Sequence, residues 1–325
     1  MSTQTLSSRN EPVSPDVRFQ VVPCKAPLGA EIRGIDLKSI DDATFKAVHD
    51  TWLNHVLLVF RGQSLDATDL VRLVKQFGVP VSSSNLHQRN LQERTANQLF
   101  NLPPEVTVVT NVKENGKAVG ILGDGEIVWH SDFSFKEAPT AARMLVAMEV
   151  PPQERGGSTF FLNGYAAYDS LSGEFRKRIA GRTIKQGNTV DTAMKLRPGA
   201  SLSDDVRYTV GPSHPIISTH PETGCNSIFL GRRHGAYVNG CSLEESEALL
   251  NELWALCTQP RFCYEHRWAK GDVVVWDNRC TVHRRDPFDA ELRRVLYAAQ
   301  VEGHRPFEAP DALGRPAHPR AGLSV

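Results

Sequence analysis

The second half of the chain consists mainly of short β-rich runs that follow one another with few helical patterns between them. Strands in such an order favour a sandwich or a jelly roll, because a doubly wound parallel sheet needs strands and helices that alternate. We therefore predict a mainly β fold with flanking helices. The strands that we expect in this half cover residues 143–148, 158–162, 227–230, 262–266, 272–276 and 295–301.

Apolar residues at helical spacing predict several helices beside these strands. A buried strand over residues 56–60 separates the first two helices. A capping box formed by Ser242 and Glu245 marks the start of the last one. The apolar faces that we assign to helices contain Phe45, Val48 and Trp52, then Leu70, Leu73, Val74 and Phe77, then residues of the segment 165–180, and finally Leu249, Leu250, Leu253 and Trp254.

The chain shows no internal repeat and no boundary between two domains, so we expect a single folded unit. Residues 82–128 contain scattered glycines without clear periodicity, and a long irregular segment inside a domain is usually functional or disordered. We expect this segment to act as a lid-like loop. The predicted parts are a flexible N-terminal tail (1–18), one domain (19–304) that includes the loop 82–128, and a proline-rich C-terminal tail (305–325).

The charges of the 325 residues balance, with 37 Lys and Arg against 37 Asp and Glu. Nucleic acids and anionic membranes bind concentrated basic surfaces, so this balance argues against both as partners. No apolar run approaches the about 20 residues of a membrane helix, and the polar start lacks the apolar segment of a signal peptide. The six cysteines show no CxxC pair, which argues against a disulfide framework. We expect a cytoplasmic protein that acts on a small molecule, with a homo-oligomer as one assembly open to it.

A His-x-Asp motif follows the glycine-rich loop. In an extended chain, residues two apart project on the same face, so His130 and Asp132 can point toward one atom. His283 follows a later predicted strand and is our candidate for a third ligand. Two histidines and one carboxylate form the facial triad of non-haem Fe(II) oxygenases, which leaves coordination positions open for O₂ and a cosubstrate. The motif taken alone is weak evidence, because this spacing is common by chance.

Arg294 lies eleven residues after His283, at the start of a predicted strand. A guanidinium group can bind a carboxylate through two hydrogen bonds, which suits a dicarboxylate cosubstrate. Spacing leaves a second interpretation open, in which Arg294 is a solvated charge within a cluster that also contains Arg284, Arg285 and Arg293.

The chain resembles the family of taurine dioxygenase and 2,4-dichlorophenoxyacetate dioxygenase, in the expected order, from about residue 20 to residue 302. This resemblance implies a double-stranded β-helix (jelly-roll) core with flanking helices, Fe(II) as the metal, and 2-oxoglutarate and O₂ as cosubstrates. The segments that carry it are residues 28–37, 129–132, 156–159 and 271–279, together with His283 and Arg294.

The resemblance also implies roles for individual residues. His130, Asp132 and His283 match the iron ligands, Arg294 matches the arginine that binds the distal carboxylate of 2-oxoglutarate, and Thr159 matches the threonine that supports it. Trp276 and Asn278 belong to the same motif, and we interpret them as packing and turn-forming residues that position His283. Because Asp132 occupies the position that halogenases leave open for chloride, we expect the oxidation to end in hydroxylation or a related C–H reaction.

One departure from the family concerns the substrate. Taurine dioxygenases carry a second arginine four residues after the 2-oxoglutarate arginine, and this chain has Ala298 there. Phe133 would face the same pocket by analogy, so we expect a more apolar site and disfavour taurine. A cation from the loop, which contains Arg89, Lys113 and Lys117, remains an alternative anchor.

Two other classes of function stay open. A jelly-roll protein can hold a metal for hydrolysis without 2-oxoglutarate, and such a site has no need of Arg294 and Thr159. A ligand-binding jelly roll without chemistry would normally lack one of the three metal ligands.

Overall fold

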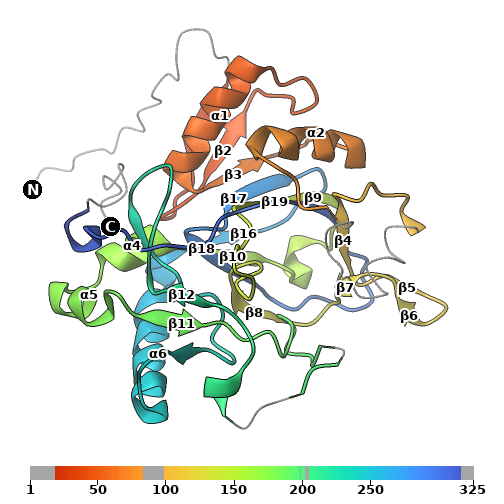
Figure 1. Ribbon diagram of the computed structural model, residues 1–325. Coiled ribbons are helices and arrows are strands. Elements are labelled where there is room, and N and C mark those ends of the chain that lie inside the picture. The colour runs from red at the N-terminus through yellow and green to blue at the C-terminus, as the bar shows by residue number, and fades with distance from the viewer. Residues whose placement is uncertain (1–18, 83–98, 198, 202–204, 316–325) are drawn as a thin grey trace, which may run out of the picture.

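An eight-stranded sheet is the largest element of the computed structural model, which describes residues 19–82, 99–197, 199–201 and 205–315 (Figure 1). Neighbouring strands within this sheet are antiparallel, except for the parallel pairs β2–β3 and β4–β7. The strands, in spatial order, are β1 (Gln20–Pro23), β2 (Ala30–Arg33), β3 (Leu57–Phe60), β17 (Val273–Asp277), β9 (Ala142–Glu149), β19 (Val295–Val301), β4 (Thr107–Thr110) and β7 (Ile121–Leu122).

A four-stranded antiparallel sheet packs against one face of this large sheet. Its order is β16 (Cys263–His266), β10 (Thr159–Asn163), β18 (Thr281–Arg285) and β8 (Ile127–His130). Phe161 of β10 meets Trp276 of β17 with 5.1 Å between the ring centroids. The shared core also contains Leu57, Val59, Leu145, Val274 and Leu296.

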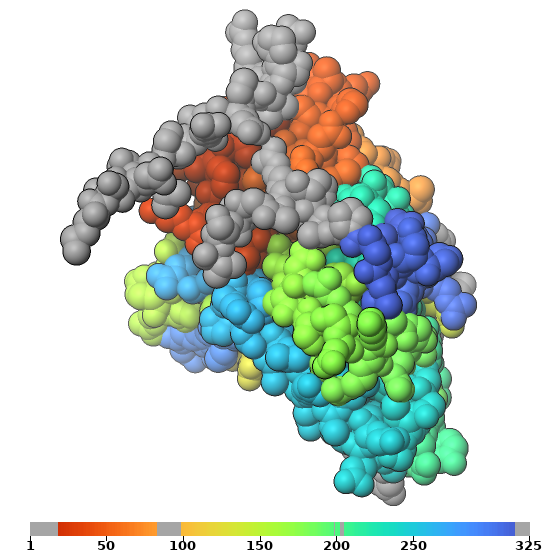
Figure 2. Space-filling model, turned by 90° about the vertical axis from the view of Figure 1, so that its left-hand side faces the viewer, coloured from red at the N-terminus to blue at the C-terminus, as the bar shows by residue number. Residues whose placement is uncertain are grey.

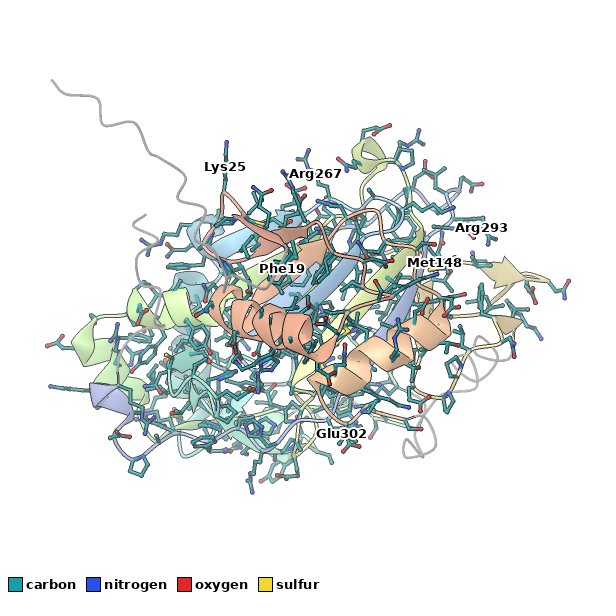
Figure 3. All side chains as sticks on the ribbon, turned by 90° about the horizontal axis from the view of Figure 1, so that it is seen from above. Phe19, Lys25, Met148, Arg267, Arg293 and Glu302 are labelled. Carbon is teal, nitrogen blue, oxygen red and sulfur yellow. The ribbon has the colours of Figure 1, made fainter. Side chains whose placement is uncertain are left out.

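Two helices cover the opposite face of the large sheet, α1 (Asp42–His55) and α2 (Ala67–Phe77) (Figures 1 and 3). Side chains alternate between the faces of a strand. Leu58, Phe60, Met144 and Val275 therefore face the helices, while their sequence neighbours face the smaller sheet. Both helices begin at an aspartate N-cap, and α2 ends before Gly78 as its sequence predicts.

A second group of elements packs beside the four-stranded sheet around its own apolar cluster, which includes Leu250, Leu253, Ile217 and Val238. It comprises α4 (Gly164–Asp169), α5 (Gly173–Ile179), α6 (Leu243–Cys257), the sheet β12 (Ser213–Pro215)–β11 (Thr183–Lys185)–β15 (Tyr237–Val238) and the pair β13 (Ile217–Thr219)–β14 (Asn226–Ile228). The remaining pair is the hairpin β5 (Lys113–Glu114)–β6 (Lys117–Ala118), and 3₁₀ turns occur at Gln153–Arg155, Val206–Tyr208, Pro260–Phe262 and Ala312–Gly314.

The strands predicted from apolar runs agree with the structure to within two residues at each end. The single helix expected over 165–180 is wrong, because α4 and α5 are separate. Ser172 causes the break, since its side chain accepts a hydrogen bond from the amide of Phe175 and so begins a new helix.

The segment 82–128 is less irregular than its sequence suggests. Residues 83–98 lie outside the described residues, but β4 is an integral strand of the large sheet and pairs with β19. The run Val106–Thr110 is rich in β-branched residues, and the surrounding glycines obscured this signal in the sequence. A lid function for the remainder of the segment stays a prediction.

The described part of the C-terminal segment lies against the second group of elements (Figure 2). Thr219 of β13 donates its amide to the carbonyl of Phe307, at 2.8 Å, and Ala309 and Ala312 are buried. Among the described residues, no helix is long and apolar enough to cross a membrane.

Candidate active site

Pairing between β8 and β18 places the two histidines of the candidate triad opposite each other. His130 and His283 are direct partners in the register, and their ring centroids lie 4.1 Å apart. Asp132 follows two residues after His130. All three side chains are buried, and one ligand atom from each lies within 4.8 Å of the other two. The structure thus brings together the three predicted metal ligands from distant parts of the sequence.

Hydrogen bonding and packing orient the two imidazoles. The Nδ1 atom of His130 lies 2.8 Å from the carbonyl of Val128, so an N–H there donates to that carbonyl and leaves Nε2 as a free ligand atom. His283 packs against Trp276, with 4.9 Å between centroids, and against Phe161. Burial and the neighbouring His130 lower the pKa of His283 well below its usual value. Both features suit neutral imidazole ligands.

Asp132 has one engaged and one free carboxylate oxygen. Arg143 donates from Nη1 to Oδ1 at 2.6 Å, whereas Oδ2 is buried and has no hydrogen-bond partner among the described residues. Burial alone would raise the pKa of Asp132, but Arg143 and the two histidines hold it well below its usual value. An ionised oxygen that lacks a hydrogen-bond partner, beside two imidazole rings, fits a divalent transition metal.

The loop of Asp132 is held by Asn278. The amide of Asp132 donates to Asn278 Oδ1 at 2.8 Å, and Asn278 Nδ2 donates to the carbonyls of Asp132 (3.0 Å) and Thr140 (2.8 Å). The sequence interpretation is that Asn278 positions His283. In the structure its side chain bonds to Asp132 and Thr140 instead, because the turn after β17 reaches across to the residues that follow β8. Trp276 does pack against the His283 ring, as its place in the motif predicts.

Arg294 and Thr159 lie in a second buried cluster between the sheets. Trp268 joins them, since its Nε1 donates to Thr159 Oγ1 at 2.9 Å and its ring lies 5.9 Å from the Arg294 guanidinium. The amide of Arg294 donates to Asn111 Oδ1 at 2.9 Å. Burial and the neighbouring Arg285 lower the pKa of Arg294 well below its usual value. Among the described residues, no carboxylate forms an ion pair with Arg294.

The other arginines of the cluster differ in environment. Arg293 lies at the periphery of the molecule and pairs with Glu149 at 2.7 Å (Figure 3). Arg284 pairs with Asp286 and stacks on Phe160. Arg285, in contrast, is buried and shares the inward face of β18 with His283. The sequence contained a signal for it in the alternation of strand residues, but β18 itself was not predicted.

The residues expected at the substrate pocket are more scattered. Ala298 is buried on β19, on the same face as Arg294. Phe133 has a φ of 54° and packs against Phe135 and the Lys136 ammonium group. Of the alternative anchors, Lys113 and Lys117 are exposed on the β5–β6 hairpin, and Arg89 lies outside the described residues.

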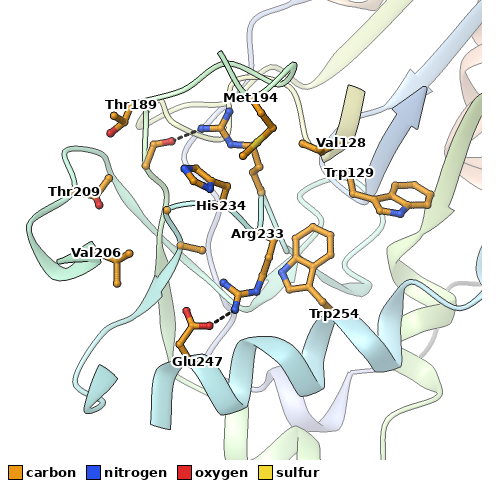
Figure 4. Close-up of a pocket in the computed structure, with 14 residues that line it drawn as sticks. Val128, Trp129, Thr189, Met194, Val206, Thr209, Arg233, His234, Glu247 and Trp254 are labelled. Atoms are coloured by element: carbon orange, nitrogen blue, oxygen red, sulfur yellow. Dashed lines mark hydrogen bonds and ion pairs between the residues drawn. The ribbon is translucent and has the colours of Figure 1, made fainter. Parts of the chain in front are cut away.

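A cavity of about 630 Å³ adjoins β8, the strand that carries His130 (Figure 4). The backbone of Arg232 forms an isolated antiparallel β-bridge with the backbone of His130. Its guanidinium donates to the carbonyls of Val190 and Gly187, both at 2.8 Å. Burial lowers the pKa of Arg232 to about 10. Sequence analysis missed this cavity, because its walls come from β8, α6 and several loops that are far apart in the sequence. They include Val128, Trp129, Met194, Arg232, Arg233, His234, Glu247 and Trp254.

Comparison with known proteins places this geometry in context. The model of the family described as "Taurine catabolism dioxygenase TauD, TfdA family" matches residues 20–300. A (S)-phenoxypropionate/alpha-ketoglutarate-dioxygenase from Delftia acidovorans is 33% identical over 302 residues, which are 88% of this chain and 95% of that protein. An alpha-ketoglutarate-dependent 2,4-dichlorophenoxyacetate dioxygenase from a Burkholderia species is 32% identical, over 82% of this chain and 88% of that protein.

A solved structure extends the comparison to the fold. The crystal structure described as a putative alpha-ketoglutarate-dependent taurine dioxygenase from Burkholderia xenovorans has a TM-score of 0.69 and 26% identity. The match covers 90% of this chain and 92% of that one. Similarity therefore extends over nearly the whole chain in both sequence and structure.

Proposed function

Because this chain belongs to the TauD, TfdA family and is a 2-oxoglutarate-dependent dioxygenase, we propose that it binds Fe(II) through His130, Asp132 and His283. The observation that carries the proposal is the buried Asp132 Oδ2, which has no hydrogen-bond partner in the described part of the chain and lies 3.8 Å from His283 Nε2. We further propose that the two facing sheets form the double-stranded β-helix (jelly roll) expected from the sequence.

The metal with its cosubstrate would supply an oxidant able to attack an unactivated C–H bond. The residues of the chain contribute position and environment. Arg143 fixes the orientation of Asp132, and the Val128 carbonyl fixes the tautomer of His130. Arg294 and Thr159 would bind the distal carboxylate of 2-oxoglutarate. The aromatic rings of Phe161 and Trp276 keep water away from His283.

We propose that the substrate is a small organic acid with an aryl or alkyl portion, which binds in the cavity beside β8. Trp129, Met194 and Trp254 offer apolar surface, and Arg232 offers a buried positive charge that forms no ion pair within the described residues. The names of two relatives, which refer to phenoxypropionate and 2,4-dichlorophenoxyacetate, support an aromatic acid. Ala298 in place of a second arginine argues against taurine.

We propose hydroxylation as the usual outcome. The carboxylate of Asp132 occupies the coordination position that a halide would need, so a halogenated product in chloride or bromide buffer would remove Asp132 from the ligand set.

The test of metal and cosubstrate binding is anaerobic addition of Fe(II) and 2-oxoglutarate, followed by visible absorption. The proposal predicts a weak metal-to-ligand charge-transfer band in the wild-type protein and its loss in His283→Ala. A folded wild-type protein without the band contradicts the proposal.

A further inference from the structure

Two buried guanidinium groups meet at the end of the site that holds Thr159. Arg285 comes from β18 of the smaller sheet, and Arg294 directly precedes β19 of the larger one. Both lie over the ring of Phe288, at 5.1 Å and 5.7 Å from its centroid. Within the described residues, neither guanidinium forms an ion pair with a carboxylate. Asp124 lies on a nearby turn and offsets part of the Arg285 charge.

Such an arrangement is costly in an empty site. Each guanidinium loses hydration on burial, the two positive charges repel each other, and one aromatic ring compensates only part of this cost. A bound anion between the two groups would remove the repulsion and supply charge-assisted hydrogen bonds. The space between the two guanidinium groups therefore suits a bound carboxylate, and we refer to it as the distal subsite.

Strand register relates this subsite to the metal site. Thr159 pairs with Arg285 and Phe161 pairs with His283, so these four side chains lie on the inward face of neighbouring strands. Residues two apart on a strand are separated by about 7 Å. A five-carbon diacid spans a comparable distance, with one end at the His283 level and the other at the level of Arg285.

Arg285 also holds the turn that precedes β8. Its Nη2 donates to the carbonyl of Leu122, at 3.0 Å, and to the carbonyl of Gly125. The amide of Phe288 donates to the carbonyl of Asp124 at 3.1 Å, so Arg285 and Phe288 both form hydrogen bonds to the same turn. Leu122 has a φ of 70°, which is unfavourable for a residue with a side chain and needs such external support.

We propose that Arg285 is a second cation for the distal carboxylate of 2-oxoglutarate and that it couples binding of this carboxylate to the order of the turn 122–125. This inference rests on the proposed use of 2-oxoglutarate at the metal site. Arg285 is a binding and positioning residue here and is not one of the three proposed metal ligands, of which His283 lies two residues earlier on β18.

The test measures dissociation constants by anaerobic titration of the Fe(II) protein. The variants are Arg285→Met and Arg285→Lys, and the matched control is Arg284→Met, which alters the neighbouring residue on the opposite face of β18. The ligands are 2-oxoglutarate and 2-oxopentanoate, which has the same chain length but no distal carboxylate. Hydrogen–deuterium exchange of the peptide that contains the turn 122–125 gives a second readout.

We expect Arg285→Met to weaken 2-oxoglutarate binding by about tenfold or more and to leave 2-oxopentanoate binding unchanged. Arg285→Lys should bind 2-oxoglutarate better than Arg285→Met does. In the wild type, 2-oxoglutarate should slow hydrogen exchange in the turn 122–125, and both variants should lose this protection. If Arg285→Met does not fold, Arg285→Lys decides alone: loss of the exchange protection supports the inference, and its retention contradicts it. Unchanged affinity and protection, or equal weakening for both ligands, overturns the inference while leaving the proposed function intact. A wild type that binds neither keto acid overturns both.

Discussion

The contact between Arg143 and Asp132 shows how a single residue can prepare a proposed metal ligand. The guanidinium occupies Oδ1 and keeps the carboxylate ionised, so that Oδ2 is presented to the centre of the triad. Trp276 is the strand partner of Arg143, and its ring lies 6.0 Å from the Arg143 guanidinium. We therefore propose that Arg143 aligns the carboxylate of Asp132 for the metal.

Replacing Arg143 by methionine should therefore weaken metal binding. Partners that orient metal ligands typically contribute about 10–100-fold to affinity, and we expect a loss in this range for Co(II) or Fe(II), measured by titration under anaerobic conditions. Arg143→Lys keeps a positive charge and should lose less. Equal affinity in wild type and Arg143→Met would show that Asp132 needs no such partner.

Arg294→Ala tests the other end of the site. The cosubstrate would lose its main charged partner in a buried location, which typically costs about 2–5 kcal/mol. We expect the dissociation constant of 2-oxoglutarate to rise accordingly, as followed by the charge-transfer band. Arg293→Ala is the control, because Arg293 is exposed and paired with Glu149, and its effect should be negligible. The opposite ranking would identify Arg293 as the binding residue.

At the scale of elements, the turn between β17 and β18 is held by a buried ionic network. Asp277 accepts hydrogen bonds from His220 Nε2 (2.9 Å) and from Arg279 Nε (2.8 Å) and Nη2 (2.6 Å). Burial opposes ionisation, but Arg279 and His220 hold the pKa of Asp277 well below its usual value. A depressed folded-state pKa means that this stabilisation is present above the unfolded pKa and is lost as the pH falls.

Asp277→Ala should consequently destabilise the protein by about 3–5 kcal/mol, since it leaves the buried His220 without its carboxylate and Arg279 with only the partly exposed Glu222. Urea unfolding at neutral pH measures this difference, and the gap to wild type should narrow in acid. Glu252→Ala removes an exposed ion pair with Arg178 and should change stability by less than about 1 kcal/mol. Similar effects of the two substitutions would contradict this account of the turn.

Elements with apolar side chains could be predicted from the sequence, and polar ones could not. β17 and β19 were found because their residues pack into cores on both faces. β18 was missed because its inward positions carry His283 and Arg285, so the usual apolar signal is absent where the site is built. The His-x-Asp motif was readable because both ligands are close in sequence. Arg143 was not, because its contact with Asp132 depends on how the two sheets face each other.

At the scale of the whole molecule, the candidate site depends on packing between two sheets. Each sheet contributes groups that are incomplete alone. β8 and β18 carry the histidines, whereas Arg143 lies on β9 and Arg294 directly precedes β19. The neighbouring cavity likewise combines loops with α6. No local sequence pattern specifies such an arrangement, which is why Arg143 and the cavity emerged only from the structure, whereas Arg294 was predicted by resemblance to the family.

Substrate preference follows from this larger arrangement. Taurine should give no sulfite above background, because Ala298 supplies no cation on β19. Aryloxyalkanoic acids should stimulate consumption of 2-oxoglutarate, and Arg232→Met should reduce this stimulation without changing 2-oxoglutarate binding. Sulfite assays and mass spectrometry of the aryl product measure both. Efficient sulfite release from taurine would show that another cation binds the sulfonate.

The most direct test of the central claim is oxidation of 2-oxoglutarate by the Fe(II) protein under ¹⁸O₂, with succinate analysed by mass spectrometry. The account predicts succinate that carries one ¹⁸O atom, and at least a hundredfold less of it (about 3 kcal/mol or more in barrier) in His283→Ala at equal protein concentration. Succinate formation that is equal in the two proteins, or absent from folded wild type, would contradict it.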